Sequence, residues 1–134
     1  MSENTKDEAH AGSFGLRVLF ISPGIERGEL AQLVTEAVRS VGEGIVGQGR
    51  TLIGHVKAFT SVPGGSLRIN MVDLDLGPEM EDRLPEGAIV EGEMRFMAAA
   101  VGLTDEELEQ IVKGSLEPLG LRLEMGILGH KHEH

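Results

Sequence analysis

Hydrophobic residues along the chain follow two spacings, one typical of strands and one typical of helices. Residues 16–22, LRVLFIS, are apolar on both faces of an extended chain, which predicts an interior strand. From Leu30 onwards the apolar residues recur every three or four positions, which predicts an amphipathic helix. A second helix is predicted to begin at Thr104, because Thr104 and Glu107 have the spacing of a capping box.

A β-hairpin is predicted in the middle of the chain. Residues 51–62 and 66–74 are both strand-like in composition, and the glycine pair at 64–65 between them can adopt the positive φ angles of a two-residue turn. In the register that this turn imposes, Phe59 lies opposite Asn70. One side of the hairpin is then apolar, whereas the other carries a mixture of polar and apolar side chains.

Two more strands and two connections complete the pattern. Residues 88–98 and 121–128 alternate apolar and polar side chains, as strands with one buried face do. Residues 75–87 are acidic and contain two prolines, which predicts a loop. The stretch GEGIVGQG, residues 42–49, has the glycine spacing of a dinucleotide-binding loop. It follows a helix and precedes a strand, the reverse of the required order, and this favours a glycine C-cap and a flexible connection.

The predicted element order is therefore β-α-β-β-β-α-β. Two helices with one apolar stripe each, together with five strands, predict an α+β fold: a two-layer sandwich with both helices on one face of a mostly antiparallel sheet. A ferredoxin-like variant with one extra strand is the simplest arrangement of this kind. We predict a disordered N-terminal tail over residues 1–14, a single domain over 15–129 and a His-rich C-terminal tail over 130–134.

The composition excludes several classes of function. The 134 residues include 12 Lys and Arg against 22 Asp and Glu, and the formal net charge of -10 repels nucleic-acid backbones and anionic lipid surfaces. The chain has no cysteine, which excludes disulfides and thiolate chemistry. The first residues are polar and acidic, unlike a secretory signal, and no later run approaches the about 20 apolar residues that span a bilayer. We therefore expect a soluble cytoplasmic protein that binds neither nucleic acid nor membranes.

The C-terminal sequence GHKHEH is a candidate metal site. It places His130, His132 and His134 at alternate positions, so that three imidazoles of an extended chain project to the same side. Three such groups can chelate a divalent transition metal such as Zn²⁺ or Ni²⁺. The alternative is a solvated tail with incidental affinity for metals.

One face of the predicted sheet combines charged and apolar side chains. A solvated face rarely carries so much apolar surface and a buried face rarely carries so much charge, whereas a subunit interface or a shallow ligand groove accommodates both. We therefore predict self-association through this face, with cross-strand ion pairs on an open sheet as the alternative. Candidate ligand-binding residues on it are Arg68, Asn70 and Arg95. The full set assigned to this face is His55, Lys57, Arg68, Asn70, Glu91, Glu93, Arg95, Arg122 and Glu124, with Ile53, Phe59, Val72 and Met97 among them.

The same face contains the candidate residues for catalysis. His55 is the candidate acid–base group, because it lies beside Lys57 and because Glu91 or Glu93 could orient its ring. No motif surrounds a serine or threonine that could act as a nucleophile. A polar surface histidine is the alternative interpretation of His55.

Three hypotheses follow. The leading one is a small cytoplasmic binding or accessory module that forms a homo-oligomer through the mixed sheet face and can take a small-molecule ligand. The first alternative is a metal-binding protein that uses the C-terminal histidines. The second is a small oligomeric enzyme with an acid–base site around His55 at a subunit interface.

Overall fold

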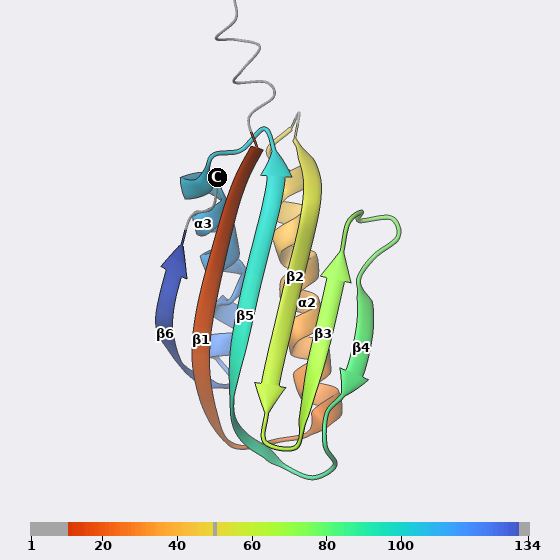
Figure 1. The fold of residues 1–134 in the computed structure, drawn as a ribbon, viewed down its shortest axis with the longest axis vertical. Helices are drawn as coiled ribbons and strands as arrows, with labels where there is room; N and C mark the ends of the chain where they lie inside the picture. Colours follow the sequence, from red (N-terminus) through yellow and green to blue (C-terminus); the bar gives the residue numbers. More distant parts are fainter. Residues whose placement is uncertain (1–10, 50, 132–134) are drawn as a thin grey trace, which may run out of the picture.

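A computed structural model describes residues 11–49 and 51–131 of the chain, and for residues 129–131 it describes the backbone. These residues form six strands and three helices, whose arrangement is drawn in Figure 1. The strands are β1 (Ala11–Ile25), β2 (Leu52–Val62), β3 (Gly65–Met71), β4 (Glu79–Arg83), β5 (Ile89–Val101) and β6 (Glu124–Lys131). The helices are α2 (Arg27–Val46), α3 (Asp105–Ser115) and α4 (Glu117–Gly120).

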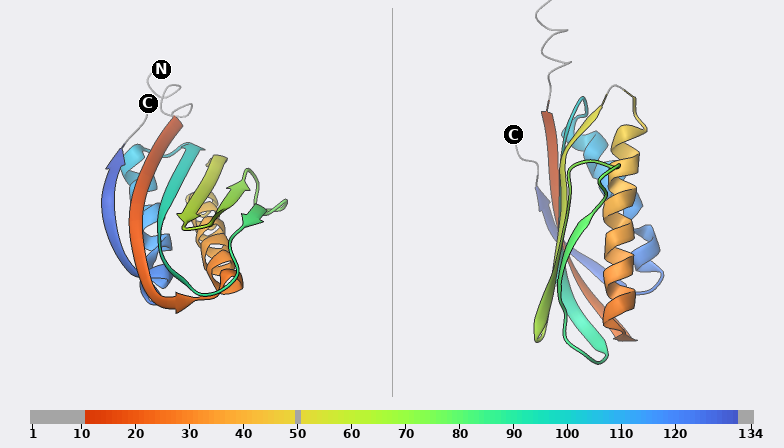
Figure 2. Two further views of the ribbon diagram at one scale, coloured as in Figure 1. Left: turned by 60° about the horizontal axis from the view of Figure 1, so that its bottom comes forward. Right: turned by 90° about the vertical axis from the view of Figure 1, so that its right-hand side faces the viewer.

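The six strands form one sheet in the order β4-β3-β2-β5-β1-β6, and every neighbouring pair is antiparallel. The helices cover one face of this sheet (Figure 2), so that the described residues form two layers. The predicted α+β class, with an antiparallel sheet and helices on one face, is therefore confirmed. The predicted five-strand ferredoxin-like arrangement is not, because the sheet has six strands and their order differs.

The additional strand, β4, lies within the acidic segment 75–87 that was predicted to be a loop. It pairs with β3 at one edge of the sheet, and all five of its residues are exposed. A charged edge strand has no alternating hydrophobic pattern, since only its backbone joins the sheet and its charges discourage further pairing. On the helix side Arg27 of α2 donates a hydrogen bond to Asp82 at 2.9 Å, which ties this edge to the helical layer.

The hairpin between β2 and β3 turns one residue earlier than predicted. Its central residues are Pro63 and Gly64, and Gly64 has a φ of 86°. Proline followed by a glycine with positive φ is the sequence that a type II turn favours. Because moving the turn by one residue shifts the register by two, Phe59 lies opposite Arg68 instead of Asn70. A shift of two keeps the side chains of the paired residues 56–62 and 65–71 on their predicted faces.

The helix was predicted to end before Gly42, but α2 continues to Val46; its C-cap, Gly47, is a glycine of the stretch in which a glycine C-cap was predicted. Gly42 and Gly44 lie inside the helix, where they allow close packing. A Cβ atom at Gly42 would collide with the end of Met71, and one at Gly44 would lie 2.8 Å from a methyl carbon of Ile111. Both glycines therefore bring α2 close to its neighbours.

The ends of the fold also differ from the predicted boundaries. Strand β1 begins at Ala11 and buries Phe14, although residues 11–14 were assigned to the N-terminal tail. Strand β6 continues to Lys131, beyond the predicted start of the C-terminal tail at residue 130. Residues 1–10 and 132–134 lie outside the described part of the chain.

The capping box predicted at the start of the second helix is confirmed. The Glu107 N–H donates to the Thr104 hydroxyl at 3.1 Å, and the Thr104 N–H donates to the Glu107 carboxylate at 2.8 Å. These two hydrogen bonds satisfy backbone N–H groups that an α-helix leaves without intrahelical partners. They place α3 at Asp105, against the end of β5 that leads into it.

Thr60 of β2 points into the core, and a first prediction concerns its hydroxyl. The residue is fully buried, and its Oγ1 has no hydrogen-bond partner in the described part of the chain. The variant Thr60→Val keeps the shape and removes the unsatisfied group, so we expect the free energy of unfolding to rise by about 1 kcal/mol. Urea unfolding measures the change. Thr35→Val is the matched control and should give no gain, because the Thr35 hydroxyl donates to the Ala31 carbonyl at 2.7 Å. An equal or lower stability of Thr60→Val would contradict the burial described.

Candidate functional site

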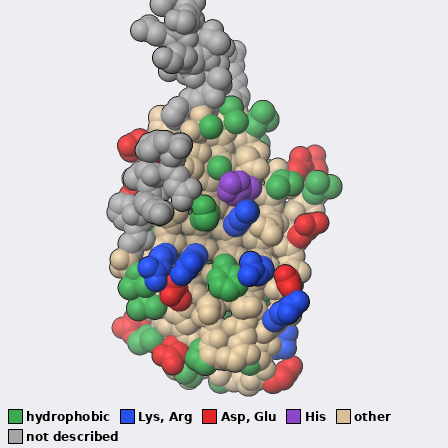
Figure 3. Space-filling model, viewed as in Figure 1, with side chains coloured by type: hydrophobic (Ala, Val, Ile, Leu, Met, Phe, Trp, Pro, Cys, Tyr) green, Lys and Arg blue, Asp and Glu red, His purple; other side chains and the backbone are tan. Residues whose placement is uncertain are grey.

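The face of the sheet opposite the helices, here called the open face, is built from alternate residues of neighbouring strands. In Figure 3 Lys and Arg side chains form a band across the middle of this face, whereas acidic side chains lie mainly toward its margins. The strand pairing shows the origin of the band, since it aligns Arg68, Phe59, Arg95 and Arg17 on the successive strands β3, β2, β5 and β1. Three arginines therefore share one row of a sheet in a chain whose net charge is -10.

Arg68 is held against an aromatic ring. Its guanidinium carbon lies 4.7 Å from the centroid of the Phe59 ring, which is a cation–π contact. In register Arg68 also lies opposite Glu81 of β4, but the Glu81 carboxylate pairs with Arg83 at 2.8 Å. Stacking orients the Arg68 guanidinium and leaves its N–H groups available, because within the described residues they have no hydrogen-bond acceptor.

Arg17 and Arg95 lie directly opposite each other, a like-charge pair that would be unfavourable alone. Glu93 resolves this repulsion by accepting hydrogen bonds from the Nε atoms of both, at 2.9 Å from Arg17 and 3.1 Å from Arg95. The bond from Arg17, followed by that from Arg95, lowers the pKa of the Glu93 carboxyl, and the same contact raises the pKa of Arg17. Glu93 therefore stays ionised at pH values at which an ordinary glutamate begins to protonate.

A shallow groove with a volume of about 340 Å³ crosses the row of arginines, and we call it the basic groove. It runs over the three strands β3, β2 and β5. Every charged side chain along it is cationic, and apolar side chains lie among them. Its lining residues are Lys57, Ala58, Phe59, Arg68, Ile69, Asn70, Arg95 and Met97.

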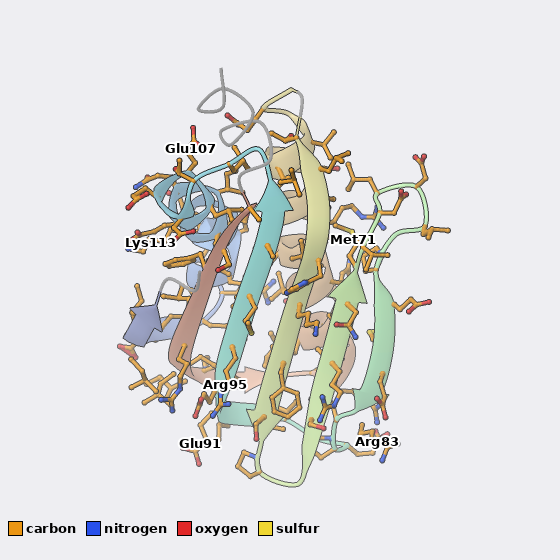
Figure 4. The ribbon with its side chains drawn as sticks, turned by 45° about the horizontal axis from the view of Figure 1, so that its top comes forward. Met71, Arg83, Glu91, Arg95, Glu107 and Lys113 are labelled. Carbon is orange, nitrogen blue, oxygen red and sulfur yellow. The ribbon has the colours of Figure 1, made fainter. Side chains whose placement is uncertain are left out.

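One end of the open face, beyond the row of arginines, is more apolar, and we call it the apolar end. Leu19 and Ile21 of β1 project from it with 47% and 51% of their surfaces exposed. Beside them is a hollow of about 410 Å³ that also involves Ser61 and Pro63. Figure 4 shows Arg95 and Glu91 on the part of β5 that leads into this end. The open face thus has a basic part and an apolar part, joined at Glu93.

The predicted ligand-binding residues Arg68, Asn70 and Arg95 all line the basic groove. Alternation along each strand was sufficient to place them on one face. Lys57, predicted as a catalytic residue, lines the same groove. Their role as ligand contacts remains a prediction.

The structure does not bring the other predicted catalytic residues together. His55 lies opposite Ala99 of β5, whereas Glu93 lies opposite Ser61. These positions are six steps apart along β5, which corresponds to roughly 20 Å, and Glu91 is farther still. Neither glutamate is therefore placed to orient the His55 ring.

Two residues assigned to the mixed face lie elsewhere. A β-bulge at Gly54 inserts one residue into β2, so Ile53 faces the helices and packs against the core. Arg122 precedes β6 in a turn, and its guanidinium pairs with Glu29 of α2 on the helix side. Strict alternation across residues 53–59 could not reveal the bulge.

Three residues that the structure places on the open face were not predicted to lie there. Arg17, Leu19 and Ile21 belong to the segment that was predicted to be an interior strand with both faces buried. One signal was present in the sequence, because Arg17 stands at an odd position and shares its face with Leu19 and Ile21. A charged residue among apolar ones marks the exposed side of such a strand.

The candidate metal ligands fall largely outside the described residues. His132 and His134 are not described, and His130 is described only as a backbone position of β6 opposite Leu16. Within the described residues, His, Asp and Glu side chains do not gather in any group of three or more that could hold a metal ion. The metal hypothesis therefore remains a prediction about the C-terminal segment.

Comparison with known proteins assigns neither a family nor a function to the chain. No protein-family model matches the chain, and no curated protein is similar to it in sequence. None of the helices among the described residues is both long and apolar enough to cross a membrane. The geometry of the open face is thus the basis for the function proposed below.

Proposed function

We propose that this chain is a small cytoplasmic binding module that self-associates through the open face of its sheet and performs no covalent catalysis of its own. The observation that carries the proposal is the composition of that face. It has exposed aliphatic side chains at Leu19 and Ile21 and a band of cations, and no described element covers it. Exposed apolar patches bordered by polar groups mark interaction surfaces in many proteins.

The size of the open face sets an upper limit on the area of a subunit interface. Six strands at a spacing of about 4.8 Å make it roughly 24 Å wide. Strands β1 and β5 pair from Ala11 to Ile21 on β1, which is roughly 35 Å. The product, on the order of 800 Å², is an upper limit because β3, β4 and β6 are shorter than β1, and a contact centred on the apolar end would bury only part of it.

The charges around the apolar end also support a contact between two copies. Arg17, Arg95 and Glu93 border it toward the basic groove, and Glu91 of β5 lies opposite Ile21. Both signs of charge are therefore present on the rim of an apolar centre. A second copy, which carries the same rim, can place its carboxylates against these guanidinium groups.

A second prediction tests this proposal with Leu19→Asp. A carboxylate at the apolar end would be desolvated between two copies, so we expect the variant to shift the protein from an oligomer to a monomer at micromolar concentration. Sedimentation velocity and native mass spectrometry measure the change in mass.

Leu76→Asp is the matched control. It introduces the same charge at a leucine that is 78% exposed and lies in the connection between β3 and β4, away from the apolar end. We expect its oligomeric state to equal that of the unchanged protein. A monomeric unchanged protein, or an oligomer that persists in Leu19→Asp, would refute self-association through this face.

We also propose that β6-β1-β5-β2 and the two longer helices form a ferredoxin-like unit, to which β3 and β4 are added at the β2 edge. The adjacency and antiparallel direction of these four strands support this assignment. In this arrangement the hairpin of β3 and β4 is an insertion between β2 and β5. The insertion then contributes Arg68 and Asn70 to the basic groove.

A further inference from the structure

We propose that the basic groove binds a small organic anion that carries two carboxylate or phosphate groups on an apolar body. The inference deepens the proposed function. It rests on that function only for the assignment of the open face as the binding surface. It concerns the groove around Phe59, whereas self-association is assigned to the apolar end around Leu19.

The charge of the groove selects an anion. Lys57, Arg68 and Arg95 are the charged residues of its lining, and all three are cations. The nearest carboxylates are Glu93, which Arg17 and Arg95 share, Glu81, which lies opposite Arg68 and pairs with Arg83, and Glu79, which lies opposite Asn70. With these groups counted, five cationic side chains and three carboxylates leave two net positive charges in this part of an otherwise acidic molecule. An oxyanion that enters the groove meets cations without displacing an internal partner.

The hydrogen-bond donors of the groove are positioned and unused. Phe59 holds the guanidinium of Arg68 from one side, and Glu81 is engaged by Arg83. Arg95 donates from Nε to Glu93, so its two terminal nitrogens stay available within the described part of the chain. Planar guanidinium groups with free N–H pairs bind carboxylate or phosphate oxygens in a bidentate manner.

The spacing of the donors favours two anionic groups. Arg68 lies on β3 and Arg95 lies on β5, with β2 between them, so their backbones are about 10 Å apart. Phe59 and Met97 provide apolar surface within the groove. A volume of about 340 Å³ falls at the lower end of the range for small-molecule pockets. A compact body with an oxyanion near each end fits this arrangement.

The surroundings of the groove exclude a long polyanion. Glu79 and Glu81 of β4 border the open face beyond Asn70 and Arg68, with which they pair in register. Glu91 lies farther along β5 from Arg95, past Glu93. A nucleic acid or an extended polyphosphate would pass over these carboxylates, whereas a small dianion stays within the cationic area.

The test uses naphthalene-2,6-dicarboxylate as the probe, titrated into the full chain by calorimetry and by amide chemical-shift mapping. Adipate, which has the same charge but no ring, is the comparison. We expect the aromatic dianion to bind at least tenfold more tightly than adipate and to shift amides of β2, β3 and β5. Equal affinities for the two probes, or no binding of either, would overturn the proposal.

Two charge-matched variants locate the site. Arg68→Gln removes one stacked guanidinium of the groove, and we expect it to weaken binding of the probe about tenfold. Arg39→Gln makes the same change in net charge on α2, on the other side of the sheet, and should leave the affinity unchanged. Equal losses in the two variants would show that the probe responds only to overall charge, and this would also overturn the proposal.

The same titration in Leu19→Asn separates this inference from the proposed function. Asparagine removes the exposed leucine of the apolar end without adding a carboxylate beside Arg17 and Glu93, and Leu19 does not line the basic groove, so this variant should bind the probe as the unchanged protein does. Binding by a protein that proves to be monomeric would refute self-association and leave the inference intact. An oligomer that binds neither probe would support self-association and refute the binding of a dianion in the basic groove.

Discussion

Phe96→Ala is expected to lower the free energy of unfolding by about 4 kcal/mol. Phe96 is 2% exposed in the central strand β5, and its register partners on either side are Leu16 and Ala58. All three face the helical layer, so the removed ring would leave a cavity between sheet and helices that backbone movement cannot close. A loss of this size is a large part of the roughly 5–15 kcal/mol that is typical of a small domain.

Urea unfolding followed by circular dichroism measures this loss, with Met97→Ala as the control on the same strand. Met97 points to the open face and is half-buried, so its truncation should cost much less. An unchanged denaturant slope in both variants would show that the transition still exposes the same surface. A loss below about 2 kcal/mol for Phe96→Ala would contradict the packing of β5 described above.

The parts of the fold that local signals specify could be predicted from the sequence. The alternation over residues 88–98 specifies which face of β5 is buried, and the spacing of Thr104 and Glu107 marks the start of α3. Both depend on neighbours within a few residues. The predicted strands and helices therefore correspond to observed ones, with ends that differ by a few residues.

The remaining features depend on contacts that are distant in sequence. Strand β4 forms because β3 offers its backbone at the sheet edge, and its own charged residues carry no pattern that indicates pairing. The bulge at Gly54 reverses the face of Ile53, and periodicity alone does not predict such an insertion. Gly42 is a glycine inside a helix because Met71 occupies the space that a larger side chain would fill, and this contact is distant in sequence.

The candidate site also has a part that local alternation predicts and a part that depends on contacts distant in sequence. Arg68, Asn70 and Arg95 were assigned to one face from alternation within their own strands, and the structure places them along one groove. The assignment of Glu91 and Glu93 to His55 needed the register between β2 and β5, which the sequence did not contain. Residues on one face of a sheet are neighbours only when strand order and register bring them together.

Gly92→Ala carries the second large expected effect, a loss of about 3 kcal/mol in the free energy of unfolding. Gly92 pairs with Phe20 in register, and the Phe20 ring occupies the space beside it. An added Cβ would lie 2.6 Å from Cε2 of that ring and 2.7 Å from the Ser61 carbonyl oxygen. Neither distance is tolerated, so the ring and the neighbouring strand must both move.

Gly126→Ala is the matched control, because Gly126 also lies in a strand but has open space around the position of its Cβ. We expect its stability to be unchanged or slightly higher, since alanine restricts the unfolded chain more than glycine does. Equal losses for Gly92→Ala and Gly126→Ala would mean that glycine at position 92 is not required by packing.

The Phe20→Leu background identifies the source of the cost of Gly92→Ala. The smaller leucine side chain leaves room for the new methyl group on the side of the ring, while the contact with the Ser61 carbonyl remains. In a double-mutant cycle we therefore expect Gly92→Ala to cost about 1 kcal/mol less in the Phe20→Leu background than in the unchanged protein. If the effects of the two substitutions are strictly additive, the whole cost of Gly92→Ala comes from the contact with the Ser61 carbonyl of β2. Such a result would make the close approach of β2 and β5, whose residues Ser61 and Gly92 line the hollow at the apolar end, the reason that this position requires glycine.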